Sequence, residues 1–586
     1  MANRLTTSNR NSGHIELDRQ CGICADVILP REQVVGLFGI PNSTEYRGCT
    51  PRFLVDGQQL CSNDSGCGIC SRSLIEYVTI HYDCIEILRR NCTTSLDAVL
   101  RRLWIVAAWR KPWRRAPLPR HLTHPVILDR GTLGTICRVS GFPQLQKLPL
   151  ELLEMVRDCY PHTLLWRCFP ILQLAAHLSV VPPEPLVTLP LADLLVWERG
   201  GGFERVTGPR PAAHTALRLS IDSTGIHKVE RLPSWPVYAG ESSTRSAFIV
   251  QEQGDISDVV AHLKDGMLRL QVPQGPYDMV VWNTPAPPFG HYQPAQFYLS
   301  KTRHVVNLEE AKGITFFFTL GQVTGIHVHR SGGSHPMDTA ARIRHPGLHL
   351  AWIYLPLSRD DPPLVLGARI TLTGDLSILV RTQRAGGVIL GPHYSHSSPF
   401  INRLFDQVLA ASRPITMIYG EPSLGGTLRL FGAHPSFRTD VETQPAPFSM
   451  AYPQPNPISD RLATYFSWAP LANVSSTVAF YDDASGDCQG VVFHYEGGGA
   501  RAVGQCRLQV DRAERVDRPA RLCFRTENVE TRDHFVVYRV QARFEQHSPS
   551  TPDDDSDQPE GWKTQSMRGI VKFWFSTGSS YLEVED

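Results

Sequence analysis

Residues 148–157 read Leu-Pro-Leu-Glu-Leu-Leu-Glu-Met-Val-Arg, and this stretch decides how the middle of the chain folds. Its proline suits the start of a helix, because the N–H that proline lacks is not needed in the first turn. The apolar side chains recur at helical spacing on one face; they are Leu148, Leu152, Leu153 and Val156. The stretch therefore predicts an amphipathic helix.

Two shorter helices are expected after it. Pro161 ends the first helix, and Thr163 can cap a second one over residues 164–169. Pro170 then interrupts the helix and suits the first turn of a third, over 171–178. Residues 147–185 are therefore predicted to form a short helical module.

The region before this module is rich in cysteine. Eight of the 14 cysteines lie between Cys21 and Cys92, and in a reducing compartment such a cluster indicates metal binding more than disulfides. Cys21 and Cys24 form a Cys-x-x-Cys, whereas His81 and Cys84 form a His-x-x-Cys before an apolar helical pattern. Positions i and i+3 are neighbours on a helix, so the two motifs together give the Cys3His set of a structural zinc site.

Two alternatives to this ligand set remain. Cys67 and Cys70 form a second Cys-x-x-Cys, which with Cys61 and Cys49 can replace one pair or belong to a second site. The cysteines can also be buried free thiols, which are common in protein cores. Residues 1–95 are thus a Cys/His-rich segment with a predicted structural zinc ion.

A basic, tryptophan-containing connector over residues 96–146 follows this segment. Interleaved cations and rings resemble a surface that binds nucleic acid. An amphipathic helix that buries Leu103, Trp104 and Val106 and turns its arginines outward explains the pattern better. The whole chain has 58 Lys and Arg against 57 Asp and Glu, so neither nucleic acid nor an anionic membrane is an expected partner.

The pattern changes to alternating apolar and polar residues after about residue 189. Runs such as 313–318, 376–380 and 491–495 are rich in β-branched and aromatic residues, and glycine-containing turns separate them. We expect a mostly antiparallel β-rich region over 190–545, an acidic disordered loop over 546–561 and a final β-hairpin over 562–586. The predicted class is a multidomain α+β protein.

No sequence pattern predicts catalysis. His327 and His329 share one face of a strand, but no carboxylate follows at a useful spacing, so we expect two solvent-facing histidines. No nucleophile, phosphate-binding or metalloprotease motif is present, and we do not expect an enzyme. The polar start and the lack of a long apolar run predict a cytoplasmic or nuclear protein.

The stretch 148–156 resembles the opening of an F-box, whose usual form is Leu-Pro-x-Glu-Leu-Leu followed by an apolar helix. Residues 164–166 and 172–175 look like the second and third F-box helices. The layout is similar to that of a group of uncharacterised fungal F-box proteins, which carry an N-terminal Cys-x-x-Cys, a later His-x-x-Cys, an F-box and a long β-rich region. Residues 313–317 and 352–357 resemble recurring strands of that group.

The resemblance implies an adaptor. F-box proteins bind the Skp linker protein and so join a cullin-type (SCF) ubiquitin ligase, while the remaining region selects a protein target. On this resemblance, seven residues face the linker or support that face: Leu148, Pro149, Leu152, Leu153, Val156, Leu165 and Trp166. Pro161 and Pro170 depart from the usual leucine-rich second half and predict a smaller partner surface.

A second hypothesis gives the β-rich region the main role. A lectin-like module that binds carbohydrate or another ligand, with a degenerate F-box, would use exposed aromatic residues for stacking. The candidates are Trp282, Tyr292 and Tyr298.

Overall fold

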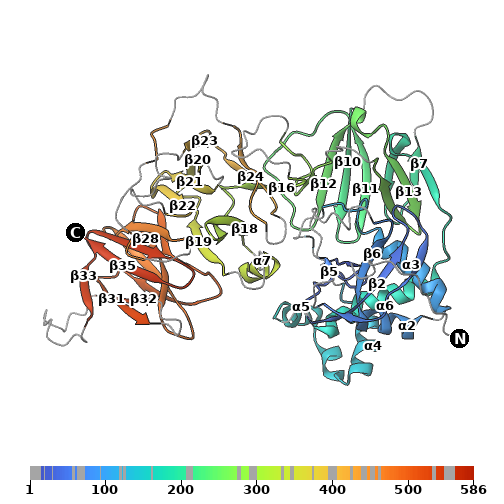
Figure 1. The fold of residues 1–586 in the computed structure, drawn as a ribbon, viewed down its shortest axis with the longest axis horizontal. Coiled ribbons are helices and arrows are strands. Elements are labelled where there is room, and N and C mark those ends of the chain that lie inside the picture. The colour runs from blue at the N-terminus through green and yellow to red at the C-terminus, as the bar shows by residue number, and fades with distance from the viewer. Residues whose placement is uncertain are drawn as a thin grey trace. The chain divides into compact units, whose positions relative to one another are not determined.

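The computed structural model of the chain divides into two compact units, Met1–Val237 with Ser242–Pro287 and Tyr238–Glu241 with Pro288–Asp586. Figure 1 colours the first unit from blue to green and the second from yellow-green to red. The structure describes residues 15–18, 20–29, 31–55, 60–61, 73–92, 94–117, 122, 127–159, 163–205, 215–273, 279–288, 300–331, 335–343, 349–371, 375–393, 405–422, 426–436, 445–448, 456–458, 463–530, 536–546 and 561–586.

A small antiparallel sheet with β2 at its centre begins the first unit. β2 pairs with β6 along one edge, and with β3 and β4 along the other. Val34, Val35 and Leu37 of β2 are buried, as expected of a central strand. The strands are β2 (Gln33–Gly39), β3 (Tyr46–Cys49), β4 (Phe53–Leu54) and β6 (Glu76–His81); β1 (Ile15–Glu16) and β5 (Leu60–Cys61) form a parallel pair.

Two helices pack with this sheet, α2 (Tyr82–Asn91) and α3 (Leu96–Ala108). Ser95 caps α3 by accepting a hydrogen bond from the N–H of Ala98. Leu103 and Trp104 are buried as the sequence predicted, whereas Val106 is only half-buried. The stretch treated as a connector therefore contributes a helix to the core of the first unit.

The next helices are α4 (Arg130–Ser140), the 3₁₀ helix η1 (Pro143–Lys147), α5 (Leu150–Cys159) and α6 (Leu164–Val180). Asp129 caps α4, and Gly141 ends it with a φ of 76°, a conformation that favours glycine. The helices share a small core of Leu133, Ile136, Cys137, Leu153, Trp166 and Phe169. Figure 1 shows them gathered at one end of the first unit.

The predicted helix break at Pro170 is wrong. Residues 164–180 form one continuous helix, α6, with Pro170 inside it. A proline inside a helix costs about 3 kcal/mol, because one backbone hydrogen bond is lost. Here Phe169, Pro170 and Ile171 are all buried, and packing on both sides of the helix offsets that cost.

Two antiparallel sheets complete the first unit and enclose one apolar core. The larger has the order β15-β12-β10-β11-β8-β9, and the smaller has the order β14-β13-β7. The strands are β7 (Val187–Pro190), β8 (Leu194–Glu198), β9 (Phe203–Arg205), β10 (Ala216–Asp222), β11 (Gly225–Leu232), β12 (Ala247–Glu252), β13 (Val260–Lys264), β14 (Met267–Gln271) and β15 (Val281–Trp282), with short 3₁₀ helices η2 (Leu191–Asp193) and η3 (Gln253–Ile256).

The second unit is built from antiparallel sheets around one large core. Its first half holds β16 (Thr302–Asn307), β17 (Gly313–Thr319), β18 (Gln322–His329), α7 (Pro336–Ile343), β19 (Ala351–Pro356), β20 (Pro363–Ile370), β21 (Leu376–Thr382), β22 (Gly386–Leu390), β23 (Phe405–Ala410), β24 (Thr416–Gly420) and β25 (Phe431–His434). These strands pair in the orders β16-β24-β25, β18-β17-β19 and β22-β21-β20-β23.

Its second half holds β26 (Tyr465–Pro470), β27 (Val474–Tyr481), β28 (Cys488–Tyr495), β29 (Ala500–Gly504), β30 (Arg512–Asp517), β31 (Arg521–Glu530), β32 (Val536–Glu545), β33 (Lys563–Ser566), β34 (Ile570–Phe575) and β35 (Ser580–Glu585). The sheet orders are β26-β34-β35, β29-β28-β27-β30 and β32-β31-β33. Residues 562–586 therefore contribute β33 to one sheet as well as the β34–β35 hairpin to another.

The β-rich α+β class is confirmed, because antiparallel sheets dominate the described residues of both units and helices are few. The unit boundary near residue 287 lies inside the region 190–545, so β7 to β15 belong with the Cys/His-rich segment. The predicted acidic loop lies outside the described residues, apart from its two ends. Among the helices described here, none combines the length and apolar character needed to cross a membrane.

Candidate metal centre

Cys21, Cys24, His81 and Cys84 converge in the first unit. Their ligand atoms all lie within 4.8 Å of one another, and all four residues are buried. His81 ends β6 and stands at the N-terminus of α2, and Cys84 lies in the first turn of that helix. The predicted grouping is therefore confirmed, and the group can hold a metal ion.

A tight turn presents the two sulfurs of Cys21 and Cys24. The N–H of Ala25 donates to the carbonyl of Cys21 at 2.9 Å, and Ala25 has a φ of 60°. Gly22 lies so close to β6 and α3 that an added Cβ would meet Val78 Cγ1 at 2.6 Å and Ala107 Cβ at 2.8 Å. Glycine is thus required between the cysteines, because only it lets the turn sit against the sheet.

The distances match a tetrahedral site. The sulfurs of Cys24 and Cys84 lie 3.7 Å apart, and His81 Nδ1 lies 3.5 Å from Cys24 Sγ and 3.7 Å from Cys84 Sγ. Metal–sulfur bonds of about 2.3 Å and metal–nitrogen bonds of about 2.0 Å at tetrahedral angles give S···S near 3.8 Å and S···N near 3.5 Å. A disulfide needs sulfurs about 2.05 Å apart, and the three cysteines of the group are not joined by one.

The thiols do not share charge equally. Burial opposes ionisation of Cys21, but hydrogen bonds from the Cys24 and Cys84 thiols and from His81 hold its pKa well below the usual range. Backbone N–H groups of Ile23 and His81 also donate to its sulfur, each at 3.4 Å. The hydrogen bond to Cys21 raises the pKa of both Cys24 and Cys84. A bound cation would supply the charge that lets all three sulfurs ionise.

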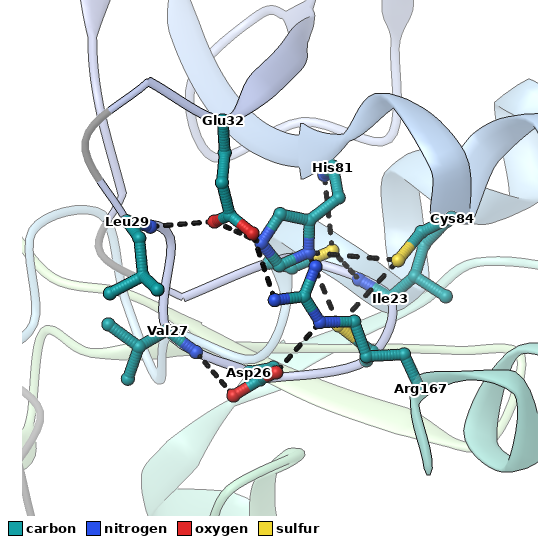
Figure 2. Close-up of polar contacts among 10 residues, drawn as sticks. Ile23, Asp26, Val27, Leu29, Glu32, His81, Cys84 and Arg167 are labelled. Atoms are coloured by element: carbon teal, nitrogen blue, oxygen red, sulfur yellow. Dashed lines mark hydrogen bonds and ion pairs between the residues drawn. The ribbon is translucent and has the colours of Figure 1, made fainter. Parts of the chain in front are cut away.

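A second layer of polar residues orients His81. With Nδ1 facing the sulfurs, Nε2 lies 3.1 Å from Glu32 Oε2, the carboxylate–histidine arrangement typical of metal ligands (Figure 2). Glu32 in turn accepts from the N–H of Leu29 at 2.7 Å and from Arg167 at 2.9 Å. Burial alone would raise the pKa of Glu32, but these hydrogen bonds outweigh it and the pKa is lowered. The histidine therefore meets an ionised carboxylate.

Two arginines bring positive charge to the centre. Arg110 donates to the carbonyl oxygens of Cys21 at 3.1 Å and Ile23 at 2.6 Å, which fixes the Cys-x-x-Cys turn. Arg167, from α6, donates to Asp26 at 2.8 Å as well as to Glu32 (Figure 2). Sequence spacing gave no signal for Arg110, Glu32 or Arg167, because each comes from a different segment and none belongs to a ligand motif.

Of the alternative cysteines, the structure describes the side chain of Cys49, which is not part of this group. Cys67 and Cys70 lie outside the described residues, as does the side chain of Cys61. Cys49 is exposed on β3. The described structure therefore groups Cys21 and Cys24 with His81 and Cys84, and a role for the second Cys-x-x-Cys stays a prediction.

The predicted partner-binding residues separate into two sets. Leu153 and Trp166 are buried in the core that α4, α5 and α6 share. Leu152 and Val156 are 44% and 40% exposed on α5, and Met155, which the prediction did not include, is 63% exposed. Leu148 and Leu165 are half-buried against that core, and Pro149 is exposed. One helix face thus packs inward and the other faces solvent.

The expectation for the histidines of β18 is wrong. His327 is 4% exposed and His329 is half-buried, so they do not form a solvent-facing pair. His327 Nδ1 lies 2.9 Å from Thr339 Oγ1, and His329 Nε2 lies 2.8 Å from Thr315 Oγ1. Burial lowers the pKa of His327 to about 3 and of His329 to about 4, so both are neutral core residues.

The suggested sugar-stacking residues gain no support. Trp282 is 5% exposed and cannot offer its ring to a ligand. Tyr292 and Tyr298 lie outside the described residues. In comparisons with known proteins, the chain matches neither a protein-family model nor a curated protein.

Proposed function

We propose that this protein is an F-box-type adaptor: its helical module binds the Skp linker protein of a cullin-type ubiquitin ligase, and its β-rich region binds a protein target. The observation that carries the proposal is the apolar outer face of α5. Leu152, Met155 and Val156 lie at positions i, i+3 and i+4 and are 40–63% exposed. An exposed apolar face of this kind on a small helical layer marks a protein-binding surface.

The inner face of the same helix strengthens the proposal. Leu153 is fully buried against Trp166 and Phe169, so α5 already has its core contacts and the outer face is not needed for folding. The N-terminal end of α6 adds another apolar side chain, Leu164, which is 45% exposed. The action we propose belongs to the cytoplasm or nucleus, where ubiquitin ligases work.

We also propose that the metal is a structural zinc ion. Three sulfurs and one imidazole nitrogen form the donor set that Zn²⁺ prefers, and all four positions come from the protein. All four residues are at most 4% exposed, which leaves no open position of the kind that catalytic zinc uses for water. The ion would join the turn at 21–24 to the junction of β6 and α2.

Binding of purified components tests the adaptor role. The full chain should capture a purified fungal Skp linker protein, and Leu152→Asp with Val156→Asp should abolish capture, because charges would enter an apolar interface. Both positions are exposed, so the variant should keep the unfolding temperature of the wild type. Glu151→Lys, also exposed on α5, is the matched charge control. A folded wild-type chain that captures no linker would refute the adaptor role.

A further inference from the structure

Helix α6 belongs to two cores at once. Trp166 and Phe169 pack with α4 and α5, the helices next to the proposed docking face. Ile171, Ala175 and Leu178 pack in the core that contains Cys21, Cys84 and the buried side of α2. One continuous helix therefore connects the helical module of α4 to α6 with the Cys/His group.

Arg167 is the polar link between them. It lies four residues before Ile171, so it shares the face of α6 that packs toward the metal centre. Its side chain is 9% exposed and bridges two carboxylates that follow the Cys-x-x-Cys turn, Asp26 and Glu32, and Glu32 contacts His81. Burial lowers the pKa of Arg167, but the hydrogen bonds to these carboxylates outweigh it and the pKa is raised. Figure 2 shows the continuous path from Arg167 through Glu32 to His81.

We propose that Arg167 is a positioning residue that couples metal binding to the placement of α6, so that the loaded centre holds the docking module in its binding form. The docking half of this inference rests on the adaptor function proposed above. Metal binding fixes His81, and His81 fixes Glu32, which together with Asp26 neutralises Arg167. Without the metal, the segment that holds Asp26 and Glu32 is no longer joined to α2 through the ligands. The two carboxylates are then less well fixed as partners of the buried Arg167 guanidinium.

Coupling of this kind is reciprocal. If the metal stabilises the position of α6, then α6 in place must raise the affinity of the centre for metal by the same factor. Residues that orient a metal ligand typically change metal affinity by about 10- to 100-fold when they are replaced. Arg167→Gln should therefore weaken zinc binding by about that factor, although the hydrogen bonds of Arg167 go to Asp26 and Glu32 and not to a ligand atom.

A matched control holds the same helix from α3. Arg102, from α3, donates to the carbonyl oxygens of Leu178 at 2.6 Å and Val181 at 2.7 Å, so it also holds α6 through a guanidinium. Among the described residues, Arg102 makes no hydrogen bond or ion pair with Asp26, Glu32 or His81. Arg102→Gln should loosen the end of α6 but leave zinc affinity within about two-fold of wild type.

The experiment compares the full chain with these variants. Zinc affinity is measured by competition with a chelating dye, and the visible absorption of the cobalt-substituted protein reports ligand geometry. Hydrogen exchange of α6 is followed in the loaded and chelated forms, with β31 and β32 as a reference in the second unit. Arg167→Lys, which keeps the charge but not the two-carboxylate bridge, should recover part of the lost affinity.

The proposal predicts faster exchange of α6 after chelation and about 10- to 100-fold weaker zinc binding in Arg167→Gln. Unchanged exchange in α6, or zinc affinity in Arg167→Gln within two-fold of wild type, would overturn the coupling. Equal capture of the Skp linker by loaded and chelated chains would overturn its docking half. Capture by neither form would instead remove the adaptor function, while the link between metal and α6 would stand on the dye and exchange measurements.

Discussion

Replacing Cys84 by serine should remove most of the metal affinity while the chain still folds. Cys84 supplies one of four ligand atoms and is fully buried. Structural zinc ions bind with about 10–16 kcal/mol, so one ligand in four contributes roughly 2.5–4 kcal/mol. That loss corresponds to an affinity about 100- to 1,000-fold weaker.

The expected loss of stability follows by mass action. Free zinc at about 1,000 times its dissociation constant stabilises the folded state by about 4.1 kcal/mol. After the weakening expected for Cys84→Ser, the same zinc concentration would contribute only about 0.4–1.4 kcal/mol. The first unit should therefore unfold about 5–15 °C lower, since 1 kcal/mol shifts a domain of this size class by about 2–4 °C.

The assay combines zinc titration against a chelating dye with calorimetric unfolding in zinc and in chelator. Cys92→Ser is the matched control, because Cys92 is a free, half-buried cysteine at the other end of α2 and outside the metal group. It should keep wild-type zinc affinity. Two results would refute the assignment of the four ligands. One is a zinc affinity of Cys84→Ser equal to that of the wild type, and the other is a wild-type unfolding temperature that the chelator does not change.

Three further predictions concern the rest of the fold. Leu153→Ala, which opens the core of α4 to α6, should cost about 2–5 kcal/mol in a denaturant titration, whereas Leu152→Ala should cost less than about 0.5 kcal/mol; equal losses would contradict the two-faced helix. Asp222→Asn weakens two hydrogen bonds from Arg199 and should cost about 1.5–3 kcal/mol at pH 7. Burial raises the pKa of Asp222, but Arg199 outweighs it and the pKa is lowered, so this difference should vanish as pH falls through the folded pKa; a constant difference down to pH 2 would contradict it. Burial lowers the pKa of His327 to about 3 in the folded state, below the unfolded value near 6.5, so the unfolded state takes up the proton first as the pH falls. Between these two values, His327 should lower the free energy of unfolding of the second unit by about 1.4 kcal/mol per pH unit. His327→Gln should remove this contribution to the dependence of stability on pH, and an unchanged dependence would refute the prediction.

The sequence predicted those features that depend on spacing along the chain. His81 and Cys84 lie three residues apart across the start of a helix, so a short motif was enough to place both beside one ion. The structure adds the reason for the residue between the cysteines, because Gly22 packs too closely against Val78 and Ala107 for a side chain to fit. The helix after Leu148-Pro149 was predicted for a similar reason, because its apolar spacing and N-terminal proline are local signals.

Features that depend on tertiary packing were missed. Pro170 looked like a helix break because a local rule assigns it a cost, and burial of its neighbours in the folded unit offsets that cost. His327 looked exposed because histidine usually is, and Thr339 from α7 supplies the partner that permits its burial. Glu32 and Arg167 meet across a sequence separation of 135 residues, so no motif could have joined them to the metal ligands.

The double packing of α6 also limits where a partner can bind. Trp166 faces the core of α4 and α5, and Ile171 and Ala175 face the core of the metal centre, so neither face is free for docking without unfolding the unit. Exposed apolar side chains do lie on the outer face of α5, with Leu164 at the start of α6. An interface built on a few exposed side chains binds best when its helices are already fixed, because the entropy lost by ordering the helices on binding would lower the affinity. On the coupling proposed above, a metal ion bound by the buried Cys/His group would anchor α6 from its other side and supply that rigidity.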